Sequence, residues 1–391
     1  MELNKRNTIC LVIAFFTALI FMLFLSNKQW SFNHQYILNF FDSSSKFTRV
    51  QLTIHTRFVF LFVEQLQNAT SLSPINTSEI LLIYVYANVH VHAYGNLKYF
   101  IETAVRENDG VDYVFILQQT EDKPIDETKL PRLPQKNAFY FQHENKCFDY
   151  GTMGWFFDQF TIGNPWQSST SVTEHVNRNN QSNAVFNLKQ YKYFIFMNSS
   201  IRGPFFPPYF MKFVSDYQME FHKPFYWYTI FIRRLNDKVK LVGGTISCIP
   251  VPHVQSYLLV TDFVGFSLLL KSSTANTGRI YAGVFGCYPS KSDTTAISEL
   301  GISKMILDSG YMMSSLMSKH QMIDFSKNAT YKCQVYENPY SDRSVDGTSL
   351  EPYDVVFVKF NAKKTTTDAQ DRAMLYQRWM EETKTNNRIL K

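Results

Sequence analysis

The 391-residue sequence lacks the short motifs that mark several large enzyme classes. It contains no Gly-x-Ser-x-Gly elbow, no Gly-x-x-x-x-Gly-Lys phosphate loop, no Gly-x-Gly-x-x-Gly fingerprint and no His-Glu-x-x-His helix. Each of these motifs places a nucleophile, a phosphate group or a zinc ion at the end of a strand or on a helix. Their absence argues against hydrolases of those types and against nucleotide kinases.

The charge is also unremarkable, because 39 Lys and Arg residues face 33 Asp and Glu residues, for a net charge of +6. The basic residues are scattered and form no run, which argues against nucleic acid as a partner. Apolar residues make up 45% of the chain and aromatic residues 16%. This composition predicts a folded protein of one large or two ordinary domains, with a strand-rich interior.

Cysteine is scarce, with five residues in the chain. Cys10 lies in an apolar segment, and the other four, Cys147, Cys248, Cys287 and Cys333, have no zinc-site spacing. An even number of cysteines predicts two disulfides in an oxidising compartment, with free buried thiols as the alternative. The sequence leaves the three possible pairings open.

One long apolar run is present near the N-terminus, where residues 8–25 carry no charge. Eighteen apolar residues are long enough to cross a bilayer core, and we predict an uncleaved anchor over residues 8–26. A cleavable signal peptide is the alternative, but its apolar region would be shorter and would end in small residues. Lys5 and Arg6 precede the run. The positive-inside rule then predicts that residues 1–7 are cytosolic and that the rest of the chain is lumenal.

These features predict a single-pass type II protein of the Golgi or endoplasmic reticulum membrane. We interpret residues 27–78 as a stem that holds a lumenal domain away from the membrane. Glycosylation sequons agree with a lumenal body and occur at Asn68, Asn76, Asn180, Asn198 and Asn328. Asn198 closes an apolar strand, so we expect no glycan there.

From residue 79 the pattern changes to alternating strands and helices. EILLIYVYANV and VDYVFIL are continuous apolar runs typical of buried parallel strands, and residues 94–105 between them have helical spacing. This βαβ unit predicts an α/β domain with a mixed, mainly parallel sheet flanked by helices. Further predicted elements are strands at 137–142, 191–198, 239–247 and 353–360 and helices at 149–160 and 298–318. The tail, residues 361–391, is polar.

Polar side chains follow several of these strands. The strand at residues 191–198 ends in Asn198, Ser199 and Ser200, and Arg202 follows in a loop rich in Gly and Pro. Open α/β sheets bind ligands beyond the carboxyl ends of their strands, so this stretch is our first candidate site.

Two more groups fall at equivalent positions earlier in the chain. Asn88 follows the first strand, and Asn145, Asp149 and Gly151 lie where a helix begins. Free N–H groups at such a terminus favour an anion, and Asp149 is suited to accept a hydrogen bond from a ribose or base. The alternative for Asp149 is an ordinary helix cap.

The C-terminal half supplies candidates for acid–base chemistry. His253 and Gln255 follow a Pro-Val-Pro turn, Asp262 comes further on, and Glu299 lies at a predicted helix start. A carboxylate or a histidine there would take a proton from an attacking hydroxyl. Glu299 could equally be an acidic residue that complements a helix dipole, and His253 a structural histidine.

Six stretches in order resemble a family of glycosyltransferases with a GT-A-like fold, similar to bacterial rhamnan-synthesis transferases and found also in type II membrane proteins. They are ENKCFDYGTMGW, YFIFMNSSIRGPFFP, KLVGGTISC, PHVQSYLLVTDFVGF, SELGISKMILDSGY and PYDVVFVKF. The resemblance covers residues 79–360. It implies transfer of a hexosyl or deoxyhexosyl group from a nucleotide sugar to a glycan or glycoprotein acceptor. Asn145, Asp149, Asn198, Ser200 and Arg202 match the donor-side motifs, and His253, Gln255, Asp262 and Glu299 match the later ones.

The chain departs from the pattern of such enzymes at residues 198–200. Where a pair of carboxylates usually holds a divalent cation against the diphosphate, this chain has Asn-Ser-Ser. We therefore assign no metal ligands, keep Mn²⁺ or Mg²⁺ as the alternative cofactor, and expect Arg202 to neutralise the diphosphate. The alternative function is a catalytically inactive lumenal protein that binds a carbohydrate or a nucleotide sugar.

Overall fold

A computed structural model describes most of the region after residue 77. The described residues are 78–120, 124–134, 136–163, 185–207, 209–210, 214, 225–272, 283–321, 323–326, 338–361 and 367–389. The chain divides into two units, Met1–Ser71 and Leu72–Lys391, and the first lies wholly outside the described residues. The predicted cytosolic segment, membrane anchor and stem up to residue 77 therefore lie outside them too. Within the described ranges, no helix combines the length and the apolar character needed to cross a bilayer.

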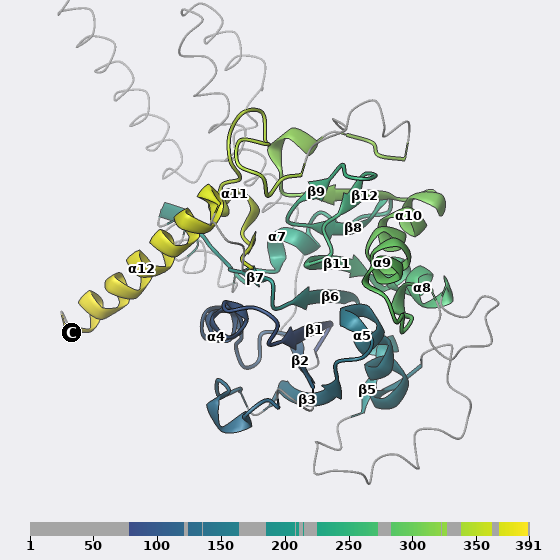
Figure 1. Ribbon diagram of the computed structural model, residues 1–391, viewed down its shortest axis with the longest axis horizontal. Helices are drawn as coiled ribbons and strands as arrows, with labels where there is room; N and C mark the ends of the chain where they lie inside the picture. The colour runs from purple at the N-terminus through teal and green to yellow at the C-terminus, as the bar shows by residue number, and fades with distance from the viewer. Residues whose placement is uncertain are drawn as a thin grey trace, which may run out of the picture. The chain divides into compact units, whose positions relative to one another are not determined.

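The described residues form an α/β fold around one seven-stranded sheet, which confirms the predicted α/β domain with a mixed, mainly parallel sheet flanked by helices (Figure 1). Across the sheet the strands are β12 (Met312–Ser315), β8 (Val239–Gly243), β11 (Leu258–Asp262), β6 (Tyr193–Asn198), β1 (Ile80–Ala87), β2 (Val111–Gln119) and β3 (Ala138–Glu144). Neighbouring strands are parallel except for β11, which is antiparallel to both β6 and β8.

Strand β1, in the interior of the sheet, explains why the sheet is covered on both faces. All eight of its residues are buried, as its continuous apolar sequence predicts. Its even-numbered residues, such as Tyr84, face the core formed with α4 (Ala93–Ala104). Its odd-numbered residues, such as Ile83, face the core formed with α5 (Phe148–Phe160), α8 (Phe263–Ser272) and α10 (Leu300–Asp308). Figure 1 shows α4 on one side of the sheet and these three helices on the other.

Smaller elements complete the described part of the chain. Three two-stranded pairs are β4 (Thr161–Ile162) with β5 (Phe186–Asn187), β7 (Ile201–Arg202) with β13 (Val358–Lys359), and β9 (Ile246–Ser247) with β10 (His253–Val254). Short helices are η1 (Glu127–Lys129), η2 (Leu188–Gln190), α7 (Thr229–Ile232), η3 (Gly283–Phe285), α9 (Lys291–Asp293), η4 (Thr294–Glu299), η5 (Ser318–His320) and α11 (Pro352–Val355).

Three predicted elements are wrong in part. The strand expected over residues 239–247 divides into β8, which ends at Gly243, and β9, which pairs with β10 outside the main sheet. The helix expected over residues 298–318 ends at Asp308, because Gly310 adopts a φ of +80° and the chain then enters strand β12. The strand expected over residues 353–360 begins instead as the helical turn α11, with Pro352 at its first position. Of that strand, β13 remains.

The polar C-terminal segment is helical in the structure. α12 (Asp368–Ile389) packs beside β13 and α11, and its residues Ala369 and Ala373 are buried in the same core as α4. Helix α12 thus belongs to the same hydrophobic core as the domain predicted for residues 79–360.

Candidate functional site

The sheet order reverses at β1, so the carboxyl ends of β1 and β6 form a topological switch point. From β1 the chain runs outward through β2 to β3, and β6 then returns to the other side of β1. Ligands of open α/β sheets bind at such a switch point. The strands are joined there by Ser199, whose hydroxyl donates to the carbonyl oxygen of Ala87 at 3.1 Å and whose N–H donates to that of Val85 at 3.0 Å.

Asn198, the last residue of β6, connects this edge to the first turn of α5. Its Nδ2 donates to Oδ2 of Asp149 at 2.9 Å, and its Oδ1 accepts from the N–H of Ser200 at 3.0 Å. Asp149 therefore does not form a side-chain cap on α5, and its carboxylate faces the strand end. Burial raises the pKa of Asp149 to about 6, the Glu299 charge adds to this effect, and the Asn198 hydrogen bond opposes it.

Glu299 brings a second carboxylate to Asp149 from the other half of the chain. It closes η4, where its Oε2 accepts from the Ser256 hydroxyl at 2.7 Å and its Oε1 accepts from the Thr295 hydroxyl at 3.4 Å. The Tyr150 hydroxyl donates to the carbonyl oxygen of Ser256 at 3.0 Å. Burial, together with the charges of Glu299 and Asp149, raises the pKa of Tyr150 well above its usual range. Tyr150 is thus a neutral donor beside the two acids.

His253 lies in the same neighbourhood, on β10. Its Nδ1 is 2.8 Å from the carbonyl oxygen of Val251, so Nδ1 carries the proton and donates, and Nε2 keeps its lone pair. Burial lowers the pKa of His253; the Glu299 charge opposes this shift and the Lys359 charge adds to it. His253 is therefore a neutral imidazole at physiological pH.

A disulfide joins the two chain segments that carry the acids. Cys147, at the start of α5, bonds to Cys287, which precedes η4. Gly154 of α5 allows close approach, because a Cβ there would lie 2.2 Å from the carbonyl oxygen of Phe285. The pairing of Cys147 with Cys287 is one of those the sequence left open. Cys248 is also disulfide-bonded, with a partner outside the described residues.

Gly151 performs a similar packing role. A Cβ on Gly151 would lie 2.6 Å from the Cβ of Cys147 and 2.9 Å from the carbonyl oxygen of Gly286. The residue before Asp149, Phe148, has a φ of +52°, which is unusual for a side chain of its size. The start of α5 is therefore held by close backbone contacts, and donor binding by Gly151 stays a prediction.

Asp262 lies away from this cluster, at the opposite end of the neighbouring strand β6. Because β11 is antiparallel to β6, Asp262 pairs with Tyr193, the first residue of β6, five positions from Asn198. At ~3.3 Å per residue the separation along the strand is roughly 17 Å. The Asp262 carboxylate accepts from Lys240 Nζ at 2.6 Å and from the N–H of Gly265 at 2.9 Å, so it pairs with a buried lysine and caps α8. From the sequence we grouped Asp262 with Glu299 as candidates for acid–base chemistry. Because β11 is antiparallel to β6, the fold separates the two residues.

Arg202 is close to the site but its guanidinium is engaged by the protein. The side chain is 8% exposed, and Nε donates to Oδ1 of Asn96 at 2.9 Å. One terminal nitrogen donates to Gln377 at 3.0 Å, and the guanidinium lies 3.9 Å from the centre of the Phe360 ring. Because the protein itself engages the guanidinium, the structure does not present Arg202 as an open ligand for the predicted diphosphate.

Three other predicted residues lie near strand ends. Asn88 is exposed after β1; Asn145 is half-buried, and its N–H donates to the carbonyl oxygen of Gln119 at 2.9 Å. Gln255 is half-buried between His253 and Ser256. The cluster therefore contains Asp149, Asn198, Ser200, His253 and Glu299, with Gln255 beside them.

The donor atoms present offer limited support for a divalent cation. Across the described ranges, no group of three or more His, Cys, Asp or Glu side chains could hold a metal ion. Mg²⁺ commonly takes one or two carboxylates with the remaining ligands from phosphate and water, and Asp149 and Glu299 are the residues that could serve it. The chemistry supplied would be neutralisation of phosphate charge.

Sequence reasoning missed Ser256, Tyr150 and Lys359. Ser256 and Tyr150 carried no signal, because their role depends on the approach of Glu299 from far along the chain. Lys359 ends β13 and pairs with Ile201, immediately after Ser200. In the sequence, Lys359 follows an apolar run and precedes Phe360, and this pattern does not indicate that it lies near Ser200.

Comparison with known proteins adds no name to this site. No known family model matches the chain, and a search of curated proteins finds no relative.

Proposed function

We propose that this protein is a glycosyltransferase that moves a sugar from a nucleotide-activated donor to a glycan or glycoprotein acceptor. The observation that carries the proposal is a hydrogen-bonded group at the switch point of the sheet. Asn198 of β6 binds Asp149 of α5, and next to Asp149 the Tyr150 hydroxyl binds the carbonyl oxygen of Ser256, whose own hydroxyl binds Glu299. A mixed, mainly parallel sheet with polar side chains at its switch point supports the GT-A-like fold that the sequence resemblance implies.

The proposed reaction needs one base and a site for a departing diphosphate. The acceptor hydroxyl oxygen attacks the anomeric carbon, its proton passes to a carboxylate, and the bond from that carbon to the diphosphate oxygen breaks. We assign the base to Glu299, whose carboxylate is oriented by the hydroxyls of Ser256 and Thr295. A positioned base of this kind contributes about 10²- to 10⁴-fold to the rate.

Lys359, whose ammonium nitrogen lies 5.3 Å from the centre of the Tyr340 ring, is our candidate for the charge that neutralises the diphosphate. It pairs with Ile201 directly after the Asn-Ser-Ser stretch, and its charge acts on His253. Arg202, the sequence's candidate, has its Nε and one terminal nitrogen engaged by Asn96 and Gln377. A divalent cation held by Asp149 and Glu299 remains the alternative source of charge.

We place the protein in the secretory pathway, as a type II membrane protein of the Golgi or endoplasmic reticulum. The disulfide between Cys147 and Cys287 supports an oxidising compartment. Glycosidase treatment of the protein from intact cells tests this placement, because a lumenal chain would carry glycans on its exposed sequons.

The test is a panel of nucleotide sugars incubated with detergent-solubilised full-length protein, with release of the nucleoside diphosphate as the readout. We expect turnover with one donor class and a loss of at least ~100-fold in Glu299→Gln with donor binding kept. Asp308→Asn is the matched control, because Asp308 is an exposed acid on the adjacent helix α10. Binding without turnover in the wild type would instead support the inactive binding protein, which the Asn-Ser-Ser stretch favours.

A further inference from the structure

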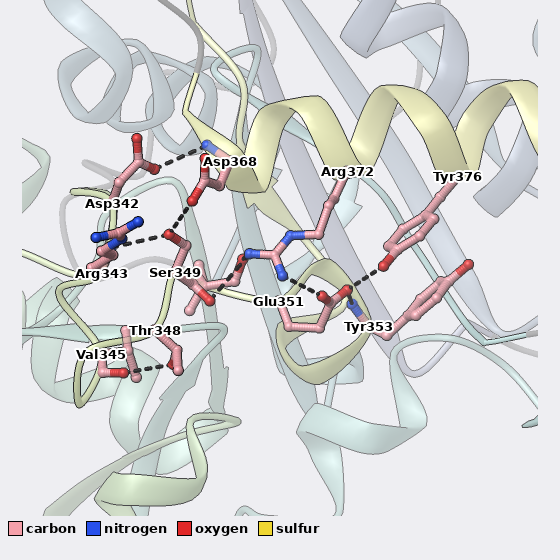
Figure 2. Close-up of polar contacts among 11 residues, drawn as sticks. Asp342, Arg343, Val345, Thr348, Ser349, Glu351, Tyr353, Asp368, Arg372 and Tyr376 are labelled. Atoms are coloured by element: carbon pink, nitrogen blue, oxygen red, sulfur yellow. Dashed lines mark hydrogen bonds and ion pairs between the residues drawn. The ribbon is translucent and has the colours of Figure 1, made fainter.

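The C-terminal helix α12 is attached to the domain through a polar cluster around Glu351 (Figure 2). Arg372 pairs with Glu351 Oε2 at 3.0 Å, and the Tyr376 hydroxyl donates to Oε1 at 2.8 Å. The Tyr376 ring also stacks on Tyr353, with 4.0 Å between the ring centres. Figure 2 shows Arg372 and Tyr376 reaching from α12 towards the one carboxylate.

The residue that follows Tyr376 in α12, Gln377, connects the helix to the interior of the domain. Gln377 Oε1 accepts from Arg202 at 3.0 Å, and Arg202 Nε donates to Asn96 Oδ1 at 2.9 Å. Asn96 is fully buried on α4, and its Nδ2 donates to the carbonyl oxygens of Ser199 and Phe360, both at 2.8 Å. A continuous path of hydrogen bonds thus runs from α12 to the residue after Asn198.

The orientation of the Asn96 amide depends on Arg202. The amide can serve two carbonyl oxygens when its NH₂ group faces them and its oxygen faces a donor. Arg202 Nε–H is that donor. If it were removed or displaced, the buried Asn96 oxygen would lack a partner, and a flipped amide would set its oxygen against the two carbonyls. Arg202 therefore keeps the NH₂ group of Asn96 oriented towards the carbonyl oxygen of Ser199.

The segment that Asn96 holds belongs to the candidate site. The N–H of Phe360 donates to the carbonyl oxygen of Ser200 at 2.6 Å, so β13 is fastened to the same stretch. The Ser199 hydroxyl joins the ends of β6 and β1, and Asn198 binds Asp149. A shift at Ser199 would consequently move groups at the end of β1 and at the start of α5.

We propose that helix α12 is a positioning element of the candidate site, acting through Gln377 and Arg202 on Asn96 and the Ser199–Ser200 stretch. In this role Arg202 is a positioning residue, where the sequence suggested a direct phosphate ligand. The inference rests on the proposed function for its effect on donor binding. Its structural half, the coupling of α12 to residues 199–202, stands without it.

The test compares three full-length variants. Gln377→Met removes the acceptor for Arg202 at similar volume, Gln377→Glu keeps an acceptor oxygen, and Arg378→Met changes the neighbouring exposed residue of α12 as a matched control. Amide hydrogen exchange over residues 199–202 and 356–361 is measured without ligand, and donor KM and kcat are measured with the donor found active. Retained exchange protection in β1 and β2 shows that each variant is folded.

For Gln377→Met we expect amide exchange at residues 199–202 to accelerate about tenfold, because one hydrogen bond is lost. We also expect the donor KM to rise several-fold while kcat stays within about twofold of the wild type. Gln377→Glu and Arg378→Met should stay near the wild type in both measurements. Unchanged exchange in Gln377→Met would overturn the inference, and so would faster exchange with an unchanged donor KM. A wild type inactive on every donor would instead overturn the proposed function, and the exchange measurement would still decide whether α12 is coupled to the site.

Discussion

The Nδ2 atom of Asn198 lies 2.9 Å from Oδ2 of Asp149, and this contact joins the end of β6 to the first turn of α5. It brings together the two sequence motifs that were assigned separately to the donor side. Because Asn198 carries an amide that donates to the carboxylate, the contact is attractive, whereas two carboxylates at this distance would repel unless a cation or a proton lay between them.

Asn198→Asp should therefore make the protein sensitive to pH. The new carboxylate loses the donated hydrogen bond and faces Asp149, so one of the two acids must stay protonated. We expect the free energy of unfolding to fall by about 1–3 kcal/mol more at pH 8 than at pH 5, measured by thermal unfolding. The double variant Asn198→Asp/Asp149→Asn exchanges the two groups and should recover stability at pH 8. An equal loss at both pH values would show that the contact is unimportant.

Asp149 itself should leave a signature in the dependence of stability on pH. Its pKa is about 6 in the folded protein against 3.8 for the ordinary group, so the folded state holds the proton more tightly than the unfolded chain. Between these values stability must decrease as pH rises, because ionisation is easier in the unfolded chain. We expect the melting temperature of the wild type, relative to Asp149→Asn, to decline between about pH 4 and pH 6. A constant difference would contradict the raised pKa.

Two glycines provide a test of the close packing beside the disulfide. A Cβ at Gly154 would lie 2.2 Å from the carbonyl oxygen of Phe285, so Gly154→Ala should lower the free energy of unfolding by about 1–3 kcal/mol or more. At Gly301 on α10 the nearest atom would be Val284 Cγ1 at 3.6 Å, and Gly301→Ala should be neutral or stabilise by up to ~1 kcal/mol. Thermal unfolding compares the two. Similar changes in the free energy of unfolding for the two variants would mean that residues 285–287 do not pack closely against α5.

Asp262 and Glu299 should respond to substitution in opposite ways. Asp262→Ala leaves the buried ammonium of Lys240 without its partner, which should cost about 3–5 kcal/mol of stability. Turnover per folded molecule should remain within about threefold of the wild type, because Asp262 lies at the opposite end of the neighbouring strand β6. Glu299→Gln should retain stability and lose turnover. An Asp262 variant that is stable but inactive would return this residue to the site.

Periodicity was sufficient to predict the centre of the fold. The continuous apolar runs at β1 and β2, the helical spacing of α4 and the polar stretch after β6 all reflect local preferences that survive in the folded chain. The failures arose where a local signal is ambiguous. Apolar residues on both sides of Gly310 fit a helix or a strand equally well, and the positive φ of that glycine decided between them.

The candidate site was predictable only in part, because its geometry depends on pairing across long stretches of chain. Asp149 and Glu299 are recognisable as acids at helix starts, but only the tertiary fold shows that the charge of Glu299 acts on Asp149. The direction of β11, which removes Asp262 from the cluster, has no signature in its five residues. The engagement of Arg202 by Gln377 depends on a helix that the sequence marks only as polar.

Thermal unfolding of the full-length protein with nucleoside diphosphates tests most directly whether the strand end at Asn198 binds a nucleotide. A ligand at 100 times its Kd should stabilise the folded state by about 2.7 kcal/mol. We predict that at least one nucleoside diphosphate raises the melting temperature of the wild type in EDTA. Lys359→Met should weaken this stabilisation. Lys192→Met should not, because Lys192 lies at the opposite end of β6. Stabilisation that appears only with manganese would contradict the role of Lys359. No stabilisation by any nucleotide, with or without manganese, would contradict the account as a whole.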